Sequence, residues 1–171
     1  VTSAWQIDRV LGVDPGTLKM GLGIVDSEAS DLSLAYAVTL SPDKKDSLPE
    51  RLHYLYTQLL DLVKKWEPSV VAIEQPFVAR NVRSAMAVGQ AEAVAMMAAA
   101  HHHLPVSRYS PREVKRAVTD YGGSSKEQVQ EMVRVLLELE QLPDSSDSAD
   151  ALAVAICHIN ASRVDDLTLE E

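Results

Sequence analysis

The chain has 171 residues, of which 46% are hydrophobic and 24% charged, a balance typical of one globular domain with a substantial core. With no apolar run near the roughly 18 residues of a membrane span and only one cysteine, we expect neither a membrane segment nor an internal disulfide framework. The formal net charge of −9 argues at first against a nucleic-acid partner, because binding to phosphates requires lysine and arginine.

The first half of the chain predicts an antiparallel meander followed by a helix. Three short apolar segments bounded by turn residues are expected to be strands, at residues 9–13, 21–26 and 32–40. Ser47 and Glu50 then match a capping box, and apolar residues recur at helical spacing as far as Trp66. A helix is therefore expected over this stretch.

The second half alternates strands with helices, a pattern that predicts parallel strands. Strands are expected at residues 69–73 and 105–109. The helix between them, from the cap residue Asn81 to about His101, is apolar nearly all round, which indicates that it is covered on more than one side. Three further helices are expected, from Ser110 to the glycines at 122–123, from residue 124 or 125 to 139, and over 147–160. The fold class is therefore α/β, with a mixed sheet.

Four acidic side chains stand beside apolar segments, where ionised carboxylates are costly. Asp14 and Glu74 follow the ends of expected strands, where open α/β sheets bind ligands, and Asp147 and Asp150 share one face at the start of an apolar helix. Taken singly, an acid after a strand is usually a turn or cap residue, and Asp147 complements a helix dipole. Taken together, four converging carboxylates require a cation, and an all-oxygen donor set favours Mg²⁺ or Mn²⁺.

The segments around these acids resemble the RuvC family of Holliday junction resolvases. The resemblance is carried by residues 11–16, 72–77 and 147–153. It implies an RNase H-like fold, with a five-stranded mixed sheet and helices on both faces, and places the family's catalytic, metal-binding acids at Asp14, Glu74, Asp147 and Asp150. The implied activity is Mg²⁺-dependent endonuclease cleavage of four-way DNA junctions in homologous recombination and repair. Two Mg²⁺ ions per site, for which Mn²⁺ can substitute, would direct paired symmetrical nicks that leave 5′-phosphate and 3′-hydroxyl ends.

The resemblance extends over residues 9–162 and implies how the chain is organised. Residues 1–8 are expected to be an N-terminal extension, residues 9–162 the nuclease domain, and the acidic residues 163–171 a disordered tail. The implied setting is the bacterial cytoplasm, with the branch-migration proteins RuvA and RuvB as partners and no membrane association.

The acidity of the whole chain conceals a basic segment beside the expected site. Residues 78–134 carry eight basic and five acidic side chains, a balance of +3. Lys126 lies in the first turn of an expected helix, which is a suitable phosphate site, and the resemblance assigns DNA contacts to Lys115 and Lys126. Arg80 and Arg112 are further candidates for DNA contacts. With so little surplus positive charge, we expect selective binding to junctions and weak binding to linear duplex.

Phe77, the only phenylalanine of the chain, has two possible roles. Composition alone favours a satellite core residue. The resemblance instead gives this position to an aromatic side chain that stacks on junction bases near the cut, a contact worth about 1–3 kcal/mol.

A homodimer suits a four-way junction, because the junction has two strands of like polarity to cut and a two-fold axis relates two active sites. The apolar helix is the expected interface, through Met86, Gly89, Ala93 and Met97. Two other functions stay open at this point. A YqgF-type RNase H-like nuclease would act on RNA, and a catalytically silent DNA-binding module would recruit a partner, although four intact acids argue against silence.

Overall fold

The computed structural model describes residues 8–75 and 81–169, and for residues 164–169 only the backbone. Five strands form a mixed sheet in the order β3-β2-β1-β4-β5. The strands are β1 (Asp8–Asp14), β2 (Met20–Glu28), β3 (Asp31–Leu40), β4 (Val70–Glu74) and β5 (Val106–Tyr109). The helices are α1 (Leu48–Trp66), α2 (Val82–His101), α3 (Pro111–Thr119), α4 (Lys126–Leu136) and α5 (Ser146–Leu169).

The strand directions confirm the expected mixed sheet. β1, β2 and β3 form the antiparallel meander, whereas β4 pairs in parallel with both β1 and β5. The parallel strands β1 and β4 therefore end at the same edge of the sheet, which is the edge where ligands bind in folds of this class.

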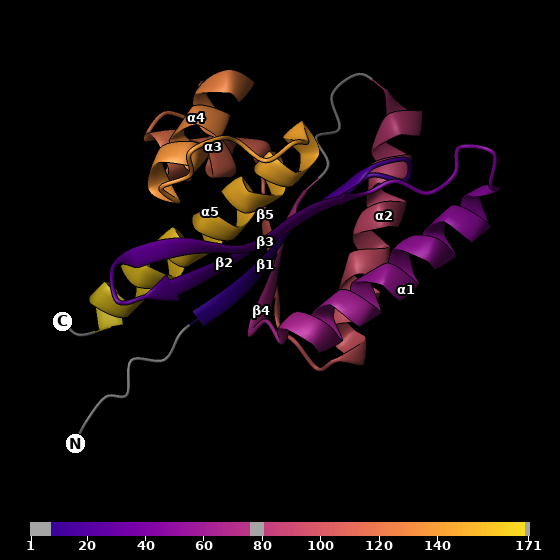
Figure 1. Cartoon of the computed structure of the whole chain (residues 1–171), viewed down its shortest axis with the longest axis horizontal. Coiled ribbons are helices and arrows are strands. Elements are labelled where there is room, and N and C mark those ends of the chain that lie inside the picture. Colours follow the sequence, from indigo (N-terminus) through magenta and orange to yellow (C-terminus); the bar gives the residue numbers. More distant parts are fainter. Residues whose placement is uncertain (1–7, 76–80, 170–171) are drawn as a thin grey trace.

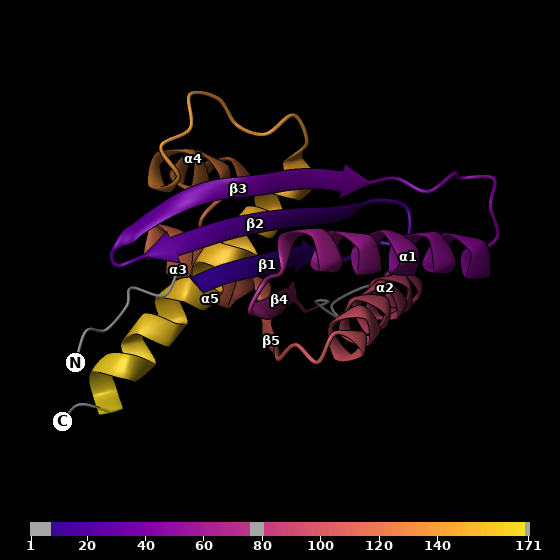
Figure 2. The same cartoon turned by 60° about the horizontal axis from the view of Figure 1, so that its bottom comes forward.

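Helices cover both faces of this sheet (Figure 1). α1 and α2 lie on one face, and α3, α4 and α5 on the other, as the rotated view also shows (Figure 2). Successive side chains of a strand point to opposite faces, so Leu11 and Val13 belong to the core shared with α1 and α2, while Val10 belongs to the core on the face of α3, α4 and α5. Two apolar cores thus fix the sheet from both sides.

The last helix is longer than expected. α5 begins at Ser146 and continues to Leu169, beyond the end expected near residue 160. Neither glycine nor proline occurs between Asn160 and Leu169, and without these residues nothing local stops the helix. The division of the chain into extension, domain and tail stays a prediction.

Within the described residues, α2 is covered on the side that faces the sheet and α1. Ala91, Ala95 and Ala98 are buried against the sheet and α1, whereas Met86 and Met97 are 62% and 59% exposed.

Within the described residues, no helix combines the length and the apolar character needed to cross a membrane.

Candidate active site

Two of the four acids meet because their strands end together. Val13 of β1 pairs with Ile73 of β4 in parallel register, and each is followed by an acid, Asp14 or Glu74. Both acids are half-buried at the carboxyl edge of the sheet. The register therefore places the two carboxylates side by side, as the sequence predicted.

The other two acids are brought in by glycines of the sheet. A side chain at Gly12 would overlap the carbonyl oxygen of Ala151, and one at Gly21 would overlap the carbonyl oxygen of Asp147. Because both positions lack a Cβ atom, the first turns of α5 lie directly on the backbone of β1 and β2. Asp147 and Asp150 thereby reach the strand-end acids. The sequence places Gly12 and Gly21 in expected strands but does not reveal this role.

The strand-end carboxyls are hard to ionise in the absence of a counter-charge. Burial raises the pKa of Asp14 to about 8, and the negative charges of the other three acids add to this shift. Burial and the charge of Asp150 raise the pKa of Glu74 to about 7. The positive charge of Lys126 opposes both shifts. The four acids therefore form one electrostatic unit that a cation would stabilise.

Each acid of α5 has its own partner. Lys126 Nζ lies 2.5 Å from Asp150 Oδ2, and Gln130, one turn further along α4, donates to Asp150 Oδ1 at 3.3 Å. The Ser145 hydroxyl donates to Asp147 Oδ2 at 3.2 Å. The DNA contact predicted for Lys126 stays a prediction, and in the structure this lysine forms an ion pair with Asp150.

The donor set fits a hard divalent cation. All four candidate ligands supply carboxylate oxygens, the ligands that Mg²⁺ and Mn²⁺ prefer. The described part of the chain holds no group of three or more acidic, histidine or cysteine side chains already arranged around one metal position. Ionised carboxylates repel one another, and Lys126 engages Asp150, so the ligands are gathered at one edge without being closed into a cage.

A pocket of about 220 Å³ adjoins the acids and brings the predicted lysines to them. Glu74 and Asp150 line one part, and Lys115 of α3 and Lys126 of α4 line another. Val114 contributes to its apolar surface. A negatively charged phosphate group that approaches the acids would therefore pass the ammonium groups of Lys115 and Lys126.

Three further candidates for DNA contacts have different outcomes. Arg112 is exposed in the first turn of α3, where its side chain flanks Gly122. Phe77 and Arg80 lie outside the described residues, so their roles stay predictions.

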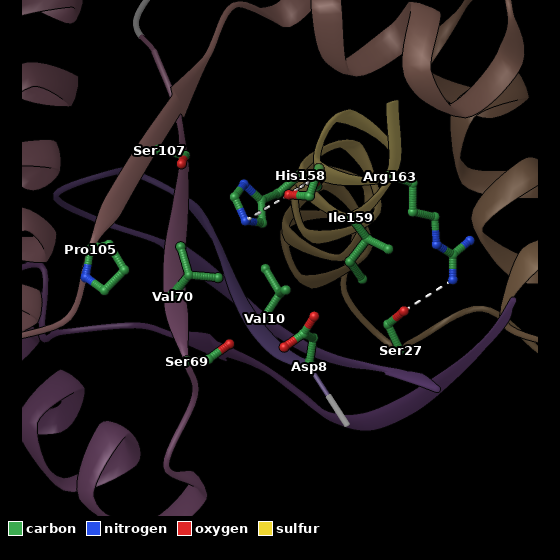
Figure 3. Close-up of a pocket in the computed structure, with 11 residues that line it drawn as sticks. Asp8, Val10, Ser27, Ser69, Val70, Pro105, Ser107, His158, Ile159 and Arg163 are labelled. Atoms are coloured by element: carbon green, nitrogen blue, oxygen red, sulfur yellow. Dashed lines mark hydrogen bonds between the residues drawn. The ribbon is translucent and has the colours of Figure 1, made fainter. Parts of the chain in front are cut away.

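A second pocket, of about 320 Å³, lies at the opposite end of the strands (Figure 3). Asp8 and Val70, which begin β1 and β4, line it, whereas the acids Asp14 and Glu74 end those strands. Arg163 in this pocket donates to the Ser27 hydroxyl at 3.0 Å. Because it contains none of the four clustered acids, this pocket is not the catalytic candidate.

The chain is similar to known proteins over most of its length. A family model described as "Crossover junction endodeoxyribonuclease RuvC" matches residues 10–158. A protein of that name from Dehalococcoides mccartyi is 49% identical over 150 residues, covering 88% of this chain and 90% of the relative. Another from Thermomicrobium roseum is 44% identical over 155 residues, covering 91% of this chain and 94% of the relative.

Solved structures show the same architecture. Thermus thermophilus RuvC in complex with a Holliday junction substrate superposes with a TM-score of 0.88 at 32% identity, covering 92% of this chain and 96% of that one. The yeast mitochondrial Holliday junction resolvase superposes with a TM-score of 0.65 at 17% identity, covering 90% and 78%, and shows that the fold extends to distant proteins.

Proposed function

Because the chain belongs to the RuvC family of crossover junction endodeoxyribonucleases, we propose that it resolves four-way DNA junctions in homologous recombination and repair. The observation that carries the proposal is the meeting of four acids from β1, β4 and α5 at one edge of the sheet, with raised pKa values for Asp14 and Glu74. The similarity to a RuvC solved with its junction substrate supports the choice of substrate.

Family membership implies dependence on a divalent metal. Asp14, Glu74, Asp147 and Asp150 would hold two Mg²⁺ ions per site, with Mn²⁺ as a substitute. When bound, the metal pair activates the attacking water and stabilises the leaving 3′ oxygen, which gives 5′-phosphate and 3′-hydroxyl ends.

The chain's own residues bind and orient the DNA strand at these acids. Lys126, held beside the acids by its ion pair with Asp150, would bind a backbone phosphate through its ammonium group. Lys115, on the neighbouring helix, binds a second phosphate from the same pocket. Arg112 and Arg80 extend this basic surface, and Phe77 stacks on a base next to the cut.

A homodimer would place two such sites on one junction. Met86, Gly89, Ala93 and Met97 recur every three or four residues and so share one face of α2. Met86 and Met97 are mostly exposed, and no other part of the described chain comes within 4 Å of a Cβ atom built at Gly89, so this face is available to a second copy. Ala91, by contrast, is fully buried in the core, so a substitution there would test folding rather than assembly.

The interface has a direct test. Met97→Glu would bury a charge in the dimer and should give monomers in sedimentation experiments. Met132→Glu, at a half-buried position on α4, should leave assembly unchanged. If Met97→Glu stayed dimeric, this interface would be wrong.

The cellular setting follows the family. We place the protein in the bacterial cytoplasm, with RuvA and RuvB as partners that deliver the junction. Both are proposals, supported by the RuvC relatives.

Cleavage of three synthetic substrates tests the function. With Mg²⁺, a four-way junction should receive symmetrical paired nicks whose ends can be ligated, while linear duplex and an RNA/DNA hybrid should remain intact. Preferential cutting of the hybrid would overturn the proposal in favour of an RNase H-like nuclease that acts on RNA. Tight junction binding without any cleavage would instead indicate a silent DNA-binding module.

A further inference from the structure

A chain of hydroxyl groups links the edge strand of the sheet to one of the acids. Thr39 Oγ1, near the end of β3, donates to Ser145 Oγ at 2.8 Å. Ser145 Oγ donates in turn to Asp147 Oδ2 at 3.2 Å. The backbone N–H of Asp147 donates back to Ser145 Oγ at 3.2 Å. We call these three residues the hydroxyl relay.

The count of protons fixes the direction of this relay. A serine hydroxyl has one proton to donate and two lone pairs that accept. The lone pairs of Ser145 are taken by the Thr39 hydroxyl and the Asp147 N–H. Its single proton is therefore directed to the Asp147 carboxylate. Because the Thr39 hydroxyl donates to Ser145, it does not accept the Ser145 proton in place of Asp147.

The sheet register explains why Thr39 can reach this position. Asp14 pairs with Gly21, and Gly21 pairs with Thr39, so these residues form one row across three strands. Side chains of directly paired residues project to the same face. Gly21 leaves room for the start of α5, with Asp14 on one side of it and Thr39 on the other. Asp147 lies over Gly21, and Asp14 and Thr39 therefore flank it on the two neighbouring strands.

We propose that Thr39 and Ser145 are positioning residues, which hold the Asp147 carboxylate so that one oxygen accepts the Ser145 proton and the other is free for a divalent cation. Hydrogen-bond partners of this kind orient metal-ligating carboxylates, and their loss typically weakens metal binding or activity about 10–100-fold. The inference rests on the proposed function, because it takes Asp147 to be a ligand.

Thr39 separates this role from helix capping. Ser145 directly precedes α5 and accepts the N–H of Asp147, so its replacement also removes a cap. Thr39 donates to Ser145 Oγ, not to that N–H, and lies 106 positions away from Ser145 along the chain. Thr39→Val removes the hydroxyl at nearly constant shape while the cap of α5 remains.

The experiment measures Mn²⁺ binding to the DNA-free protein, together with the Mg²⁺ dependence of junction cleavage. Thr39→Val should weaken Mn²⁺ binding about tenfold and raise the half-saturating Mg²⁺ concentration by a similar factor. Thr39→Ser, which keeps the hydroxyl, should restore both values. Unchanged Mn²⁺ binding in Thr39→Val, or equal loss in Thr39→Ser, would overturn the relay.

Two further variants separate possible failures. If Thr39 acts through Ser145, the double variant Thr39→Val/Ser145→Ala should bind Mn²⁺ no more weakly than Ser145→Ala alone, and independent additive losses would contradict the relay. Asp147→Asn serves as the reference. Should Asp147→Asn bind Mn²⁺ and cut junctions like the parent, the proposed function itself would fail, whereas a defect in Asp147→Asn with none in Thr39→Val rejects the relay alone.

Discussion

Asp14, the last residue of β1, is paired directly with Gly21 of β2. Because Gly21 has no side chain, the backbone of Asp147 can lie directly against it. Asp14, at the end of a strand, and Asp147, at the start of a helix, are therefore brought close together. The meeting of these two acids thus depends on a glycine, which has no side chain of its own.

Gly21→Ala should displace the start of α5, because its Cβ atom would overlap backbone rather than a movable side chain. We expect a loss of about 1–3 kcal/mol in the free energy of unfolding, measured with urea, and a larger proportional loss of junction cleavage. Gly123→Ala is the matched control. The atoms nearest to its Cβ belong to the side chain of the exposed Tyr121, which can move aside, so the free energy of unfolding should change by less than about 0.5 kcal/mol. Equal effects of both substitutions would contradict this account of α5.

Asp14→Asn should abolish cleavage while sparing junction binding, and should stabilise the metal-free protein. The reason for the gain is that burial and three neighbouring acids make the ionised Asp14 costly. At pH 8 we expect a gain of about 1–3 kcal/mol, measured by chemical unfolding in the presence of a chelator. Asp61→Asn, an exposed acid of α1, is the control and should change neither property. Cleavage at the parent rate by Asp14→Asn would be incompatible with the mechanism.

Metal affinity should rise with pH between about 6 and 8. The pKa values of Asp14 and Glu74 are raised to about 8 and about 7, so both groups hold protons below this range and must release them to bind a cation. Calorimetry in buffers of different ionisation enthalpy should show proton release on metal binding at pH 6.5 that declines at higher pH.

The stability of the metal-free protein should move in the opposite direction. Between the ordinary carboxyl pKa and these raised values, the folded state binds more protons than the unfolded state, so these two groups lower stability as pH rises. Asp14→Asn should flatten this decline. A decline of the same steepness in Asp14→Asn would show that Asp14 does not cause it.

Lys115 and Arg116 are neighbours in sequence but should differ in effect. Lys115 is half-buried in the pocket beside Glu74, whereas Arg116 is exposed and lines a different pocket. Lys115→Gln should lower the rate of junction cleavage about tenfold, with a smaller salt dependence of binding, and Arg116→Gln less than about threefold. Single-turnover kinetics at several salt concentrations measure both. Equal losses would mean that total charge, rather than position, matters.

The four acids could be predicted because their chemistry is local. Each acid ends or follows a recognisable apolar strand, or lies at the start of an apolar helix. Neighbouring parallel strands run in the same direction, so their carboxyl ends lie at the same edge of the sheet. The bounds of β1 and β4 therefore came within a residue of those predicted from sequence.

The residues that support the acids could not be predicted in this way. Gly12 and Gly21 become significant only when α5 crosses them, and Thr39 meets Ser145 although the two lie 106 positions apart in the chain. The role of the glycines and the Thr39–Ser145 hydrogen bond both depend on packing between elements, which a local sequence pattern does not predict. The length of α5 was missed for another reason, since an acidic composition was given more weight than the absence of glycine and proline.

The central claim is that four carboxylates form one two-metal centre, and anomalous scattering from Mn²⁺ tests it most directly. The crystals would hold the protein with a four-way junction whose scissile linkages cannot be cut. We predict two anomalous peaks per active site among Asp14, Glu74, Asp147 and Asp150, and loss of at least one peak in Asp150→Asn. Mn²⁺ bound away from these four side chains, or unchanged peaks in Asp150→Asn, would contradict the account.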